Sequence, residues 1–298
     1  MEVRRITPRG YCHGVVEAIR IAKRVGQEAV TAGADEPVAM LGYLVHNEHV
    51  TRDLEANGVR LVDRDNRFEG LQQIDSGTVI FTAHGVSPAV VQAAKDKGLN
   101  VVDATCSDVT RTHDLIERLV GEGFHVVYVG KRGHPEPEGA VGVAPDHVTL
   151  IERAEDVAAL EFADDAKLAV TCQTTLSMWD TQRVMDALID RYPQTAVHNE
   201  ICRATQERQE AAVLAADDVD CVVVVGSLRS SNSRRLVQVV EEMGHKPAYL
   251  VDTADDLRPE WFAGIHRVGV TSGASTPTQL TRAVIAALEA MPDAEAAQ

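Results

Sequence analysis

The sequence predicts an α/β protein made of three similar units, each with a mostly parallel sheet covered by helices. Short valine-rich runs alternate with amphipathic stretches along the whole chain. Continuous apolar runs between such helices are typical of parallel strands that are buried on both faces. The runs that we expect to be strands include residues 38–41, 78–81, 126–129 and 222–225.

The three units are predicted from the spacing of three cysteines. Cys12, Cys106 and Cys202 are 94 and 96 residues apart, and each follows a strand-like stretch. A helical pattern begins shortly after each of them, over residues 15–30, 109–120 and 205–215.

Two polar motifs follow each cysteine, each at the end of a predicted strand. Ligands of open α/β sheets bind beyond the carboxyl ends of the strands, so motifs placed there are candidates for a site. We expect the three units to surround a pseudo-threefold axis as a trefoil, which brings three cysteines and six motifs to one centre. The motifs are Val45-His46-Asn47, Gly133-His134-Pro135, Gly226-Ser227 running on to Ser230-Ser231-Asn232, Thr82-Ala83-His84-Gly85, Thr171-Cys172-Gln173-Thr174-Thr175 and Thr271-Ser272-Gly273-Ala274-Ser275.

The domain boundaries follow from this repeat. The chain has 298 residues, which is enough for two or three domains. We expect units over residues 13–105, 106–198 and 199–290, with residues 1–12 packing near the centre and residues 291–298 as a tail.

Composition narrows the classes of function. The net charge is −16 and aromatic residues make up 4% of the chain, which argues against binding nucleic acid through the general surface. No apolar run approaches the ~20 residues of a membrane span, and no signal peptide is expected. The five cysteines are too widely spaced to indicate a disulfide framework, so we expect a reducing, cytoplasmic setting.

Three convergent cysteines can hold a metal cluster. Thiolates that precede helices lie at the positive end of the helix dipole, which favours the ionised form that binds metal. Three such ligands would leave a cubane cluster with one iron free to bind a substrate oxygen and deliver electrons. A zinc site is the less favoured alternative because closely spaced CxxC pairs are lacking. The simplest alternative is that each cysteine is a small buried hydrophobe, which suits Cys172 and Cys221.

The polar motifs are suited to an anionic ligand. His46, His84 and His134 can donate hydrogen bonds to phosphate oxygens. The run from Ser230 to Ser233 lies between a strand and a helix predicted over residues 234–242, and Ser275 occupies a comparable turn. A plain helix cap and structural histidines are the alternatives for single motifs. No phosphate-binding loop of the GxxxxGK[ST] or GxGxxG type occurs, so nucleotide binding has no support.

A proton donor is expected beside the second histidine motif. Glu136 follows His134 in a segment that Pro135 and Pro137 stiffen. A carboxyl group placed there could relay protons. Thr174 and Thr175 could pass or orient that proton.

The chain resembles the family of 4-hydroxy-3-methylbut-2-enyl diphosphate reductases, the last enzymes of the non-mevalonate isoprenoid pathway, from about Ile6 to Leu280. Some of the nine motifs are weak singly, but their common order is specific. They are Pro8-Arg9-Gly10-Tyr11-Cys12-His13-Gly14-Val15, Leu44-Val45-His46-Asn47, Ala83-His84-Gly85-Val86, Asp103-Ala104-Thr105-Cys106, Gly133-His134-Pro135-Glu136, Gln173-Thr174-Thr175, Glu200-Ile201-Cys202, Ser230-Ser231-Asn232-Ser233 and Gly273-Ala274-Ser275.

The resemblance implies a trefoil around one [4Fe–4S] cluster per chain. The implied reaction is a reductive dehydroxylation with two electrons and two protons. It yields isopentenyl and dimethylallyl diphosphates, with a ferredoxin or flavodoxin as electron donor. By matching motifs, the cluster ligands would be Cys12, Cys106 and Cys202; the diphosphate would be held by His46, His84, His134, Ser230, Ser231, Asn232 and Ser275; Glu136 and Thr174 would act on the hydroxyl, and Thr175 is a further candidate for substrate binding.

Two departures and two alternatives remain open at this point. Ser107 replaces a proline of the family pattern, and Cys172 stands where a polar residue is common. A redox-neutral lyase with a similar cluster is one alternative, and it would work without a reductant. An iron–sulfur sensor or phospholigand-binding protein is the other.

Overall fold

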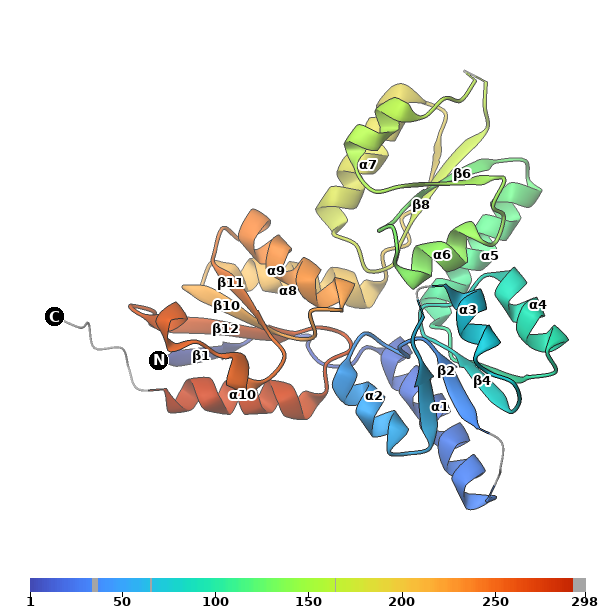
Figure 1. Cartoon of the computed structure of the whole chain (residues 1–298). Helices are drawn as coiled ribbons and strands as arrows, with labels where there is room; N and C mark the ends of the chain where they lie inside the picture. Colours follow the sequence, from blue (N-terminus) through green and yellow to red (C-terminus); the bar gives the residue numbers. More distant parts are fainter. Residues whose placement is uncertain (34–36, 65, 164, 292–298) are drawn as a thin grey trace. The chain divides into compact units, whose positions relative to one another are not determined.

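The computed structural model describes residues 1–33, 37–64, 66–163 and 165–291 (Figure 1). The chain divides into two compact units. The terminal unit comprises Met1–His13, His46–His49 and the chain from Arg203 onward, and the central unit comprises Gly14–Val45 and Val50–Cys202.

The described residues form three four-stranded sheets in which every strand pair is parallel. The terminal unit holds one sheet, in the order β1-β12-β10-β11, and the central unit holds two, β3-β2-β4-β5 and β7-β6-β8-β9. The strands are β1 (Glu2–Arg5), β2 (Val38–Leu41), β3 (Val59–Val62), β4 (Thr78–Phe81), β5 (Asn100–Asp103), β6 (His125–Val129), β7 (Val148–Ile151), β8 (Leu168–Cys172), β9 (Ala196–Val197), β10 (Cys221–Val225), β11 (Ala248–Val251) and β12 (Arg267–Ser272).

Helices connect the strands, as parallel pairing requires. None of the described helices is long and apolar enough to cross a membrane. The α-helices are α1 (His13–Thr31), α2 (Glu48–Glu55), α3 (Arg67–Gln72), α4 (Pro88–Asp96), α5 (Ser107–Gly121), α6 (Pro135–Val141), α7 (Met178–Arg191), α8 (Arg203–Ala216), α9 (Ser231–Met243) and α10 (Thr278–Ala290), and the 3₁₀ turns are η1 (Ala154–Ala159), η2 (Ala254–Asp256) and η3 (Pro259–Phe262).

All three sheets share one topology, which confirms the predicted fold class of three similar parallel α/β units. In each, the strand that precedes a cysteine (β1, β5 or β9) pairs with the strand that ends in the second polar motif (β12, β4 or β8). That strand pairs in turn with the one that ends in the first polar motif (β10, β2 or β6). The N-terminal strand β1 therefore completes the sheet of the last repeat.

The division at residues 13–105, 106–198 and 199–290 stays a prediction. So does the placement of residues 1–12 near the centre. Of the predicted tail, residues 292–298 lie outside the described residues.

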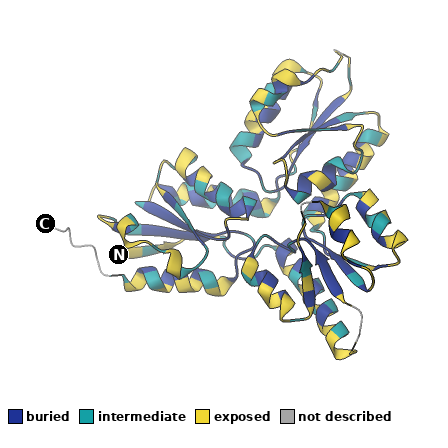
Figure 2. Ribbon diagram, in the orientation of Figure 1, coloured by how far each residue is buried: buried dark blue, intermediate teal, exposed yellow. Residues whose placement is uncertain are grey.

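The core lies on both faces of each sheet, as the apolar runs predict. Val222–Val225 in β10 and Val126–Tyr128 in β6 are fully buried, and these central strands are dark blue in Figure 2. The helices bury one stripe each, for example Val15, Ala18 and Ala22 of α1. Apolar burial of this extent is the main stabilising contribution to each unit.

Two helices near the polar motifs differ from expectation. Helix α6 was not predicted, and its segment carries two prolines. Both lie in the first turn, where a missing N–H costs little. Helix α9 begins at Ser231, three residues earlier than expected. The side chain of Ser230 caps it by accepting a hydrogen bond from the N–H of Ser233 at 3.2 Å.

Candidate active site

Each of the three repeat cysteines makes an equivalent backbone hydrogen bond. The N–H of Cys12 donates to the carbonyl of Ala274 at 3.2 Å, that of Cys106 to Ala83 at 3.1 Å, and that of Cys202 to Thr174 at 3.1 Å. Each acceptor belongs to the second polar motif of a repeat, and each cysteine directly precedes a helix (α1, α5 or α8). The fold thus ties each cysteine to the end of a central strand.

The same three cysteines fit a metal-ligating role by their exposure. Cys12, Cys106 and Cys202 are partly exposed thiols. The space beside Cys106 is kept open by Gly14, where an added Cβ would lie 2.3 Å from the Cys106 Sγ atom. Soft thiolates at helix N-termini are the donor set that iron–sulfur clusters use.

The other two cysteines are poor ligands. Cys172 and Cys221 are buried in strands, and burial raises the pKa of each thiol to about 12. Such thiols stay protonated at neutral pH, whereas a metal ligand must be a thiolate. Their placement agrees with the expectation that both are small core residues.

Glu136 is a buried acid whose pKa lies near neutral pH. It lies in the first turn of α6 and is 2% exposed. Burial raises the pKa of its carboxyl from 4.5 to about 7, against the opposing effect of hydrogen bonds from the backbone and hydroxyl of Thr174. The Thr174 N–H donates to Oε1 at 2.7 Å. A carboxyl group with this pKa can both hold and release a proton at neutral pH.

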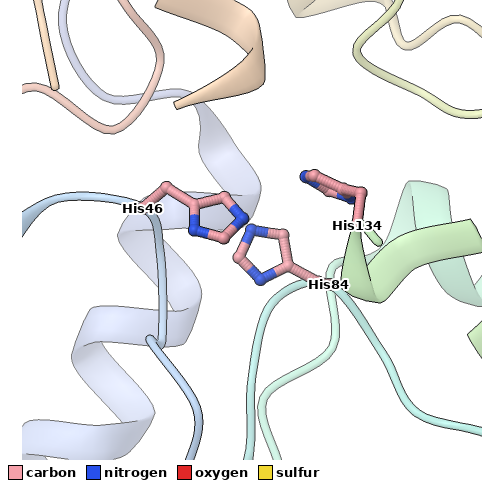
Figure 3. A group of neighbouring side chains, drawn as sticks. All are labelled: His46, His84 and His134. Atoms are coloured by element: carbon pink, nitrogen blue, oxygen red, sulfur yellow. The ribbon is translucent and has the colours of Figure 1, made fainter. Parts of the chain in front are cut away.

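His134 and His84 meet in the central unit. Their rings lie edge to face, with centroids 5.4 Å apart (Figure 3). His134 caps α6, because its Nδ1 accepts a hydrogen bond from the Glu136 N–H at 3.2 Å. His84 Nδ1 lies 3.4 Å from the hydroxyl of Thr82, at the end of β4.

Gln173 is a site residue whose role the sequence did not indicate. It is fully buried at the end of β8. Its Nε2 lies 3.3 Å from His134 Nδ1 and 3.1 Å from Thr175 Oγ1. The only sequence signal was its position beside Thr174 and Thr175.

The terminal unit gathers amide and hydroxyl groups around Ala274. The Oδ1 of Asn232 accepts a hydrogen bond from the Ala274 N–H at 3.0 Å, and the carbonyl of Ala274 accepts one from the Cys12 N–H. Asn232 Nδ2 donates to the hydroxyl of Thr205 at 3.4 Å. Ser275 Oγ donates to the carbonyl of His46 at 3.5 Å. The amide of Asn232 and the hydroxyls of Thr205 and Ser275 at this edge are polar groups that do not titrate near neutral pH.

Two glycines let these motifs approach each other. An added Cβ at Gly226 or Gly273 would lie 2.2 or 2.0 Å from the Oγ atom of Ser233. Such distances are far below van der Waals contact, so the loops after β10 and β12 can both pack against the first turn of α9 only with glycine there.

Each unit brings part of the predicted set together. In the central unit the contacts run without a break from Cys106 through Ala83, His84, His134, Glu136 and Thr174 to Cys202, with Thr175 joined through Gln173. In the terminal unit Cys12, His46, Ser230, Asn232 and Ser275 lie on or beside the loops around Ala274, and Ser231 begins α9.

Residues 3–289 match the family described as LytB protein. The chain belongs to this family. It is 58% identical to the 4-hydroxy-3-methylbut-2-enyl diphosphate reductase of Symbiobacterium thermophilum, over 97% of each chain. It is 53% identical to the enzyme of the same name from Brevibacillus brevis, over 97% of this chain and 92% of the relative. The family expected from the nine motifs is confirmed.

A solved structure gives the same fold. The E-1-hydroxy-2-methyl-but-2-enyl-4-diphosphate reductase from Plasmodium falciparum superposes with a TM-score of 0.90 at 31% sequence identity. The match covers 100% of this LytB family chain and 91% of that one.

Proposed function

We propose that this LytB family member is a 4-hydroxy-3-methylbut-2-enyl diphosphate reductase. It removes the hydroxyl of (E)-4-hydroxy-3-methylbut-2-enyl diphosphate with two electrons and two protons. The products are water and either isopentenyl or dimethylallyl diphosphate, in the last step of the non-mevalonate isoprenoid pathway. The observation that carries the proposal is Glu136, a buried acid with a pKa of about 7. Its carboxyl accepts a hydrogen bond from the N–H of Thr174, and the carbonyl of Thr174 accepts one from the N–H of Cys202.

The proposed cofactor is one [4Fe–4S] cluster per chain, with Cys12, Cys106 and Cys202 as its ligands. The shared backbone hydrogen bond and partial exposure of these thiols support this set. When bound, the cluster would supply electrons and an iron without a protein ligand that acts as a Lewis acid. A ferredoxin or flavodoxin is the proposed electron donor, in the reducing setting of the cytoplasm.

The ligand set can be tested by serine substitution. Cys12→Ser, Cys106→Ser and Cys202→Ser should each lose the stable visible absorption of the cluster after anaerobic reconstitution. Cys172→Ser and Cys221→Ser are matched controls, since these thiols are buried and protonated, and both should keep it. Retention in any of the first three variants would remove that cysteine from the set.

The proposed diphosphate pocket uses neutral donors. The chain is strongly acidic, so local donors must offset the repulsion that an anion meets from the whole protein. Hydroxyl, amide and imidazole groups directed at phosphate oxygens supply this offset. The proposed donors are His46, His84, His134, Thr175, Ser230, Ser231, Asn232 and Ser275.

Glu136 is the proposed proton source for the departing hydroxyl. The Thr174 N–H donates to Oε1 at 2.7 Å and so fixes one oxygen of the carboxyl group. Protonation converts hydroxide into water, a much better leaving group. The hydroxyl of Thr174 also bonds the carboxyl and keeps it oriented.

The reaction itself is tested with the anaerobically reconstituted enzyme, its diphosphate substrate and a low-potential reductant. We expect both isopentenyl and dimethylallyl diphosphates, and no product when the reductant is omitted. Turnover without reductant would instead indicate a redox-neutral lyase. Binding without turnover under either condition would indicate a sensor or binding protein.

A further inference from the structure

Gln173 is a fully buried amide that joins the polar motif after β6 to the polar motif after β8. It contacts Lys131 and His134 after β6, and Thr175 after β8. We propose that Gln173 is a positioning residue that makes both His134 and Thr175 hydrogen-bond donors toward the diphosphate. The inference rests on the proposed function, because it concerns how that pocket recognises an anion.

The orientation of the Gln173 amide is set by the backbone. Its Oε1 accepts a hydrogen bond from the Lys131 N–H at 3.0 Å. A backbone N–H can only donate, so the oxygen must face Lys131 and the NH₂ group must face the other two partners. Both hydrogens of the NH₂ group are then committed, one to His134 and one to Thr175.

The tautomer of His134 follows from the two groups that donate hydrogen bonds to its Nδ1 atom. Nδ1 faces the Glu136 N–H at 3.2 Å and the Gln173 Nε2 at 3.3 Å. A ring nitrogen that accepts hydrogen bonds carries no proton, so the proton of the neutral imidazole lies on Nε2. Nε2 therefore presents an N–H, which suits a phosphate oxygen.

The hydroxyl of Thr175 is turned into a donor by the same amide. Its Oγ1 accepts a hydrogen bond from Gln173 Nε2 at 3.1 Å. The hydroxyl hydrogen must then point away from the amide, toward another acceptor. Thr175 is partly exposed, so this hydrogen can reach a bound anion.

The first readout is the protonation of the His134 ring nitrogens, measured by ¹⁵N NMR of the oxidised holoenzyme with labelled histidine. The wild type should show a protonated Nε2 and an unprotonated Nδ1. In Gln173→Met, a variant of similar side-chain volume, one of the two donors to Nδ1 is lost, and a second tautomer should become populated. The exposed Gln182→Met on α7 is the control and should match the wild type.

The second readout is the affinity for inorganic diphosphate, measured by calorimetry on the same proteins. Gln173→Met should weaken binding about tenfold, because two oriented donors are lost while no charge changes. The loss should vanish in a His134→Ala/Thr175→Val background, since Gln173 acts only through these two residues.

Two results would overturn the proposal. One is a wild-type His134 with its proton on Nδ1. The other is an undiminished effect of Gln173→Met in the double-variant background, which would show that the amide acts by another route. If both readouts come out as expected and reductive turnover is absent, the positioning role stands and the proposed function fails.

Discussion

Two sheet edges of the molecule have the same backbone arrangement but different side chains. The central edge is formed by the ends of β6 and β8 in the central unit, and the terminal edge by the ends of β10 and β12 in the terminal unit. In both, a cysteine N–H donates to the carbonyl of the second motif. The central edge adds a buried acid, Glu136, and an imidazole. The terminal edge adds hydroxyls and the amide of Asn232.

This difference suits the two edges to different tasks under the proposed function. Moving a proton requires a group whose pKa lies near the working pH, and burial of the Glu136 carboxyl supplies such a group at the central edge. An affinity for an anion that does not change with pH requires donors that do not titrate. Under the proposed function, the central edge therefore combines a proton donor with donors to the anion, whereas the terminal edge supplies donors to the anion alone, and four predictions test this difference.

The largest effect should come from removing the acid of the central edge. Glu136→Gln keeps an oxygen that can accept from the Thr174 N–H but loses the acidic proton. Turnover should fall about 10²–10⁴-fold, with cluster absorption and diphosphate binding retained. Steady-state assays check this, with the exposed Glu138→Gln as a control expected to behave like the wild type. Full turnover of Glu136→Gln would remove this residue from proton transfer.

The same substitution should change how stability depends on pH. Native Glu136 holds its proton up to a pKa of about 7, whereas the unfolded chain releases it near 4.5. The native state thus binds more protons between these values, so stability is lost as the pH rises through the window, by about 3 kcal/mol. Urea unfolding of Glu136→Gln should show a correspondingly flatter profile from pH 5 to 8. Parallel profiles for variant and wild type would contradict the raised pKa.

A smaller and pH-independent effect is expected at the terminal edge. Asn232→Ala removes the acceptor of the Ala274 N–H and the bond to Thr205. KM should rise about tenfold through lost anchoring, since a hydrogen bond to a charged group contributes this order of free energy. The pH profile of kcat should keep the wild-type shape. A shifted profile would mean that this edge takes part in proton transfer.

The smallest effect concerns the strand beneath the central edge. The hydroxyl of Tyr128 in β6 is fully buried and has no hydrogen-bond partner among the described residues. Because an unpaired buried hydroxyl is unfavourable, Tyr128→Phe should stabilise the protein by about 1 kcal/mol in urea unfolding. The partly exposed Tyr249→Phe serves as the control and should change stability little. Destabilisation by Tyr128→Phe would show that the hydroxyl makes a hydrogen bond in the folded protein.

The sequence predicted the strands well because buried parallel strands are continuous apolar runs. It also placed the three cysteines correctly before helices. Helix α6 was not predicted: the two prolines of its segment indicated only stiffness, although the first turn of a helix accepts them.

Other features depend on contacts between distant segments, which no local pattern encodes. Strand β1 enters the last sheet through pairing with β12, 262 or more residues away in the chain. The pKa of Glu136 and the orientation of Gln173 both arise from packing between the ends of β6 and β8.

The central claim is that one cluster is held by the thiolates of Cys12, Cys106 and Cys202, with one iron left for the substrate. Mössbauer spectroscopy of the anaerobically reconstituted protein, with and without the diphosphate substrate, tests it most directly. We predict that substrate shifts the signal of a single iron and leaves the others unchanged. A spectrum that does not respond to substrate, or one in which all irons have the same ligand set, would contradict the account.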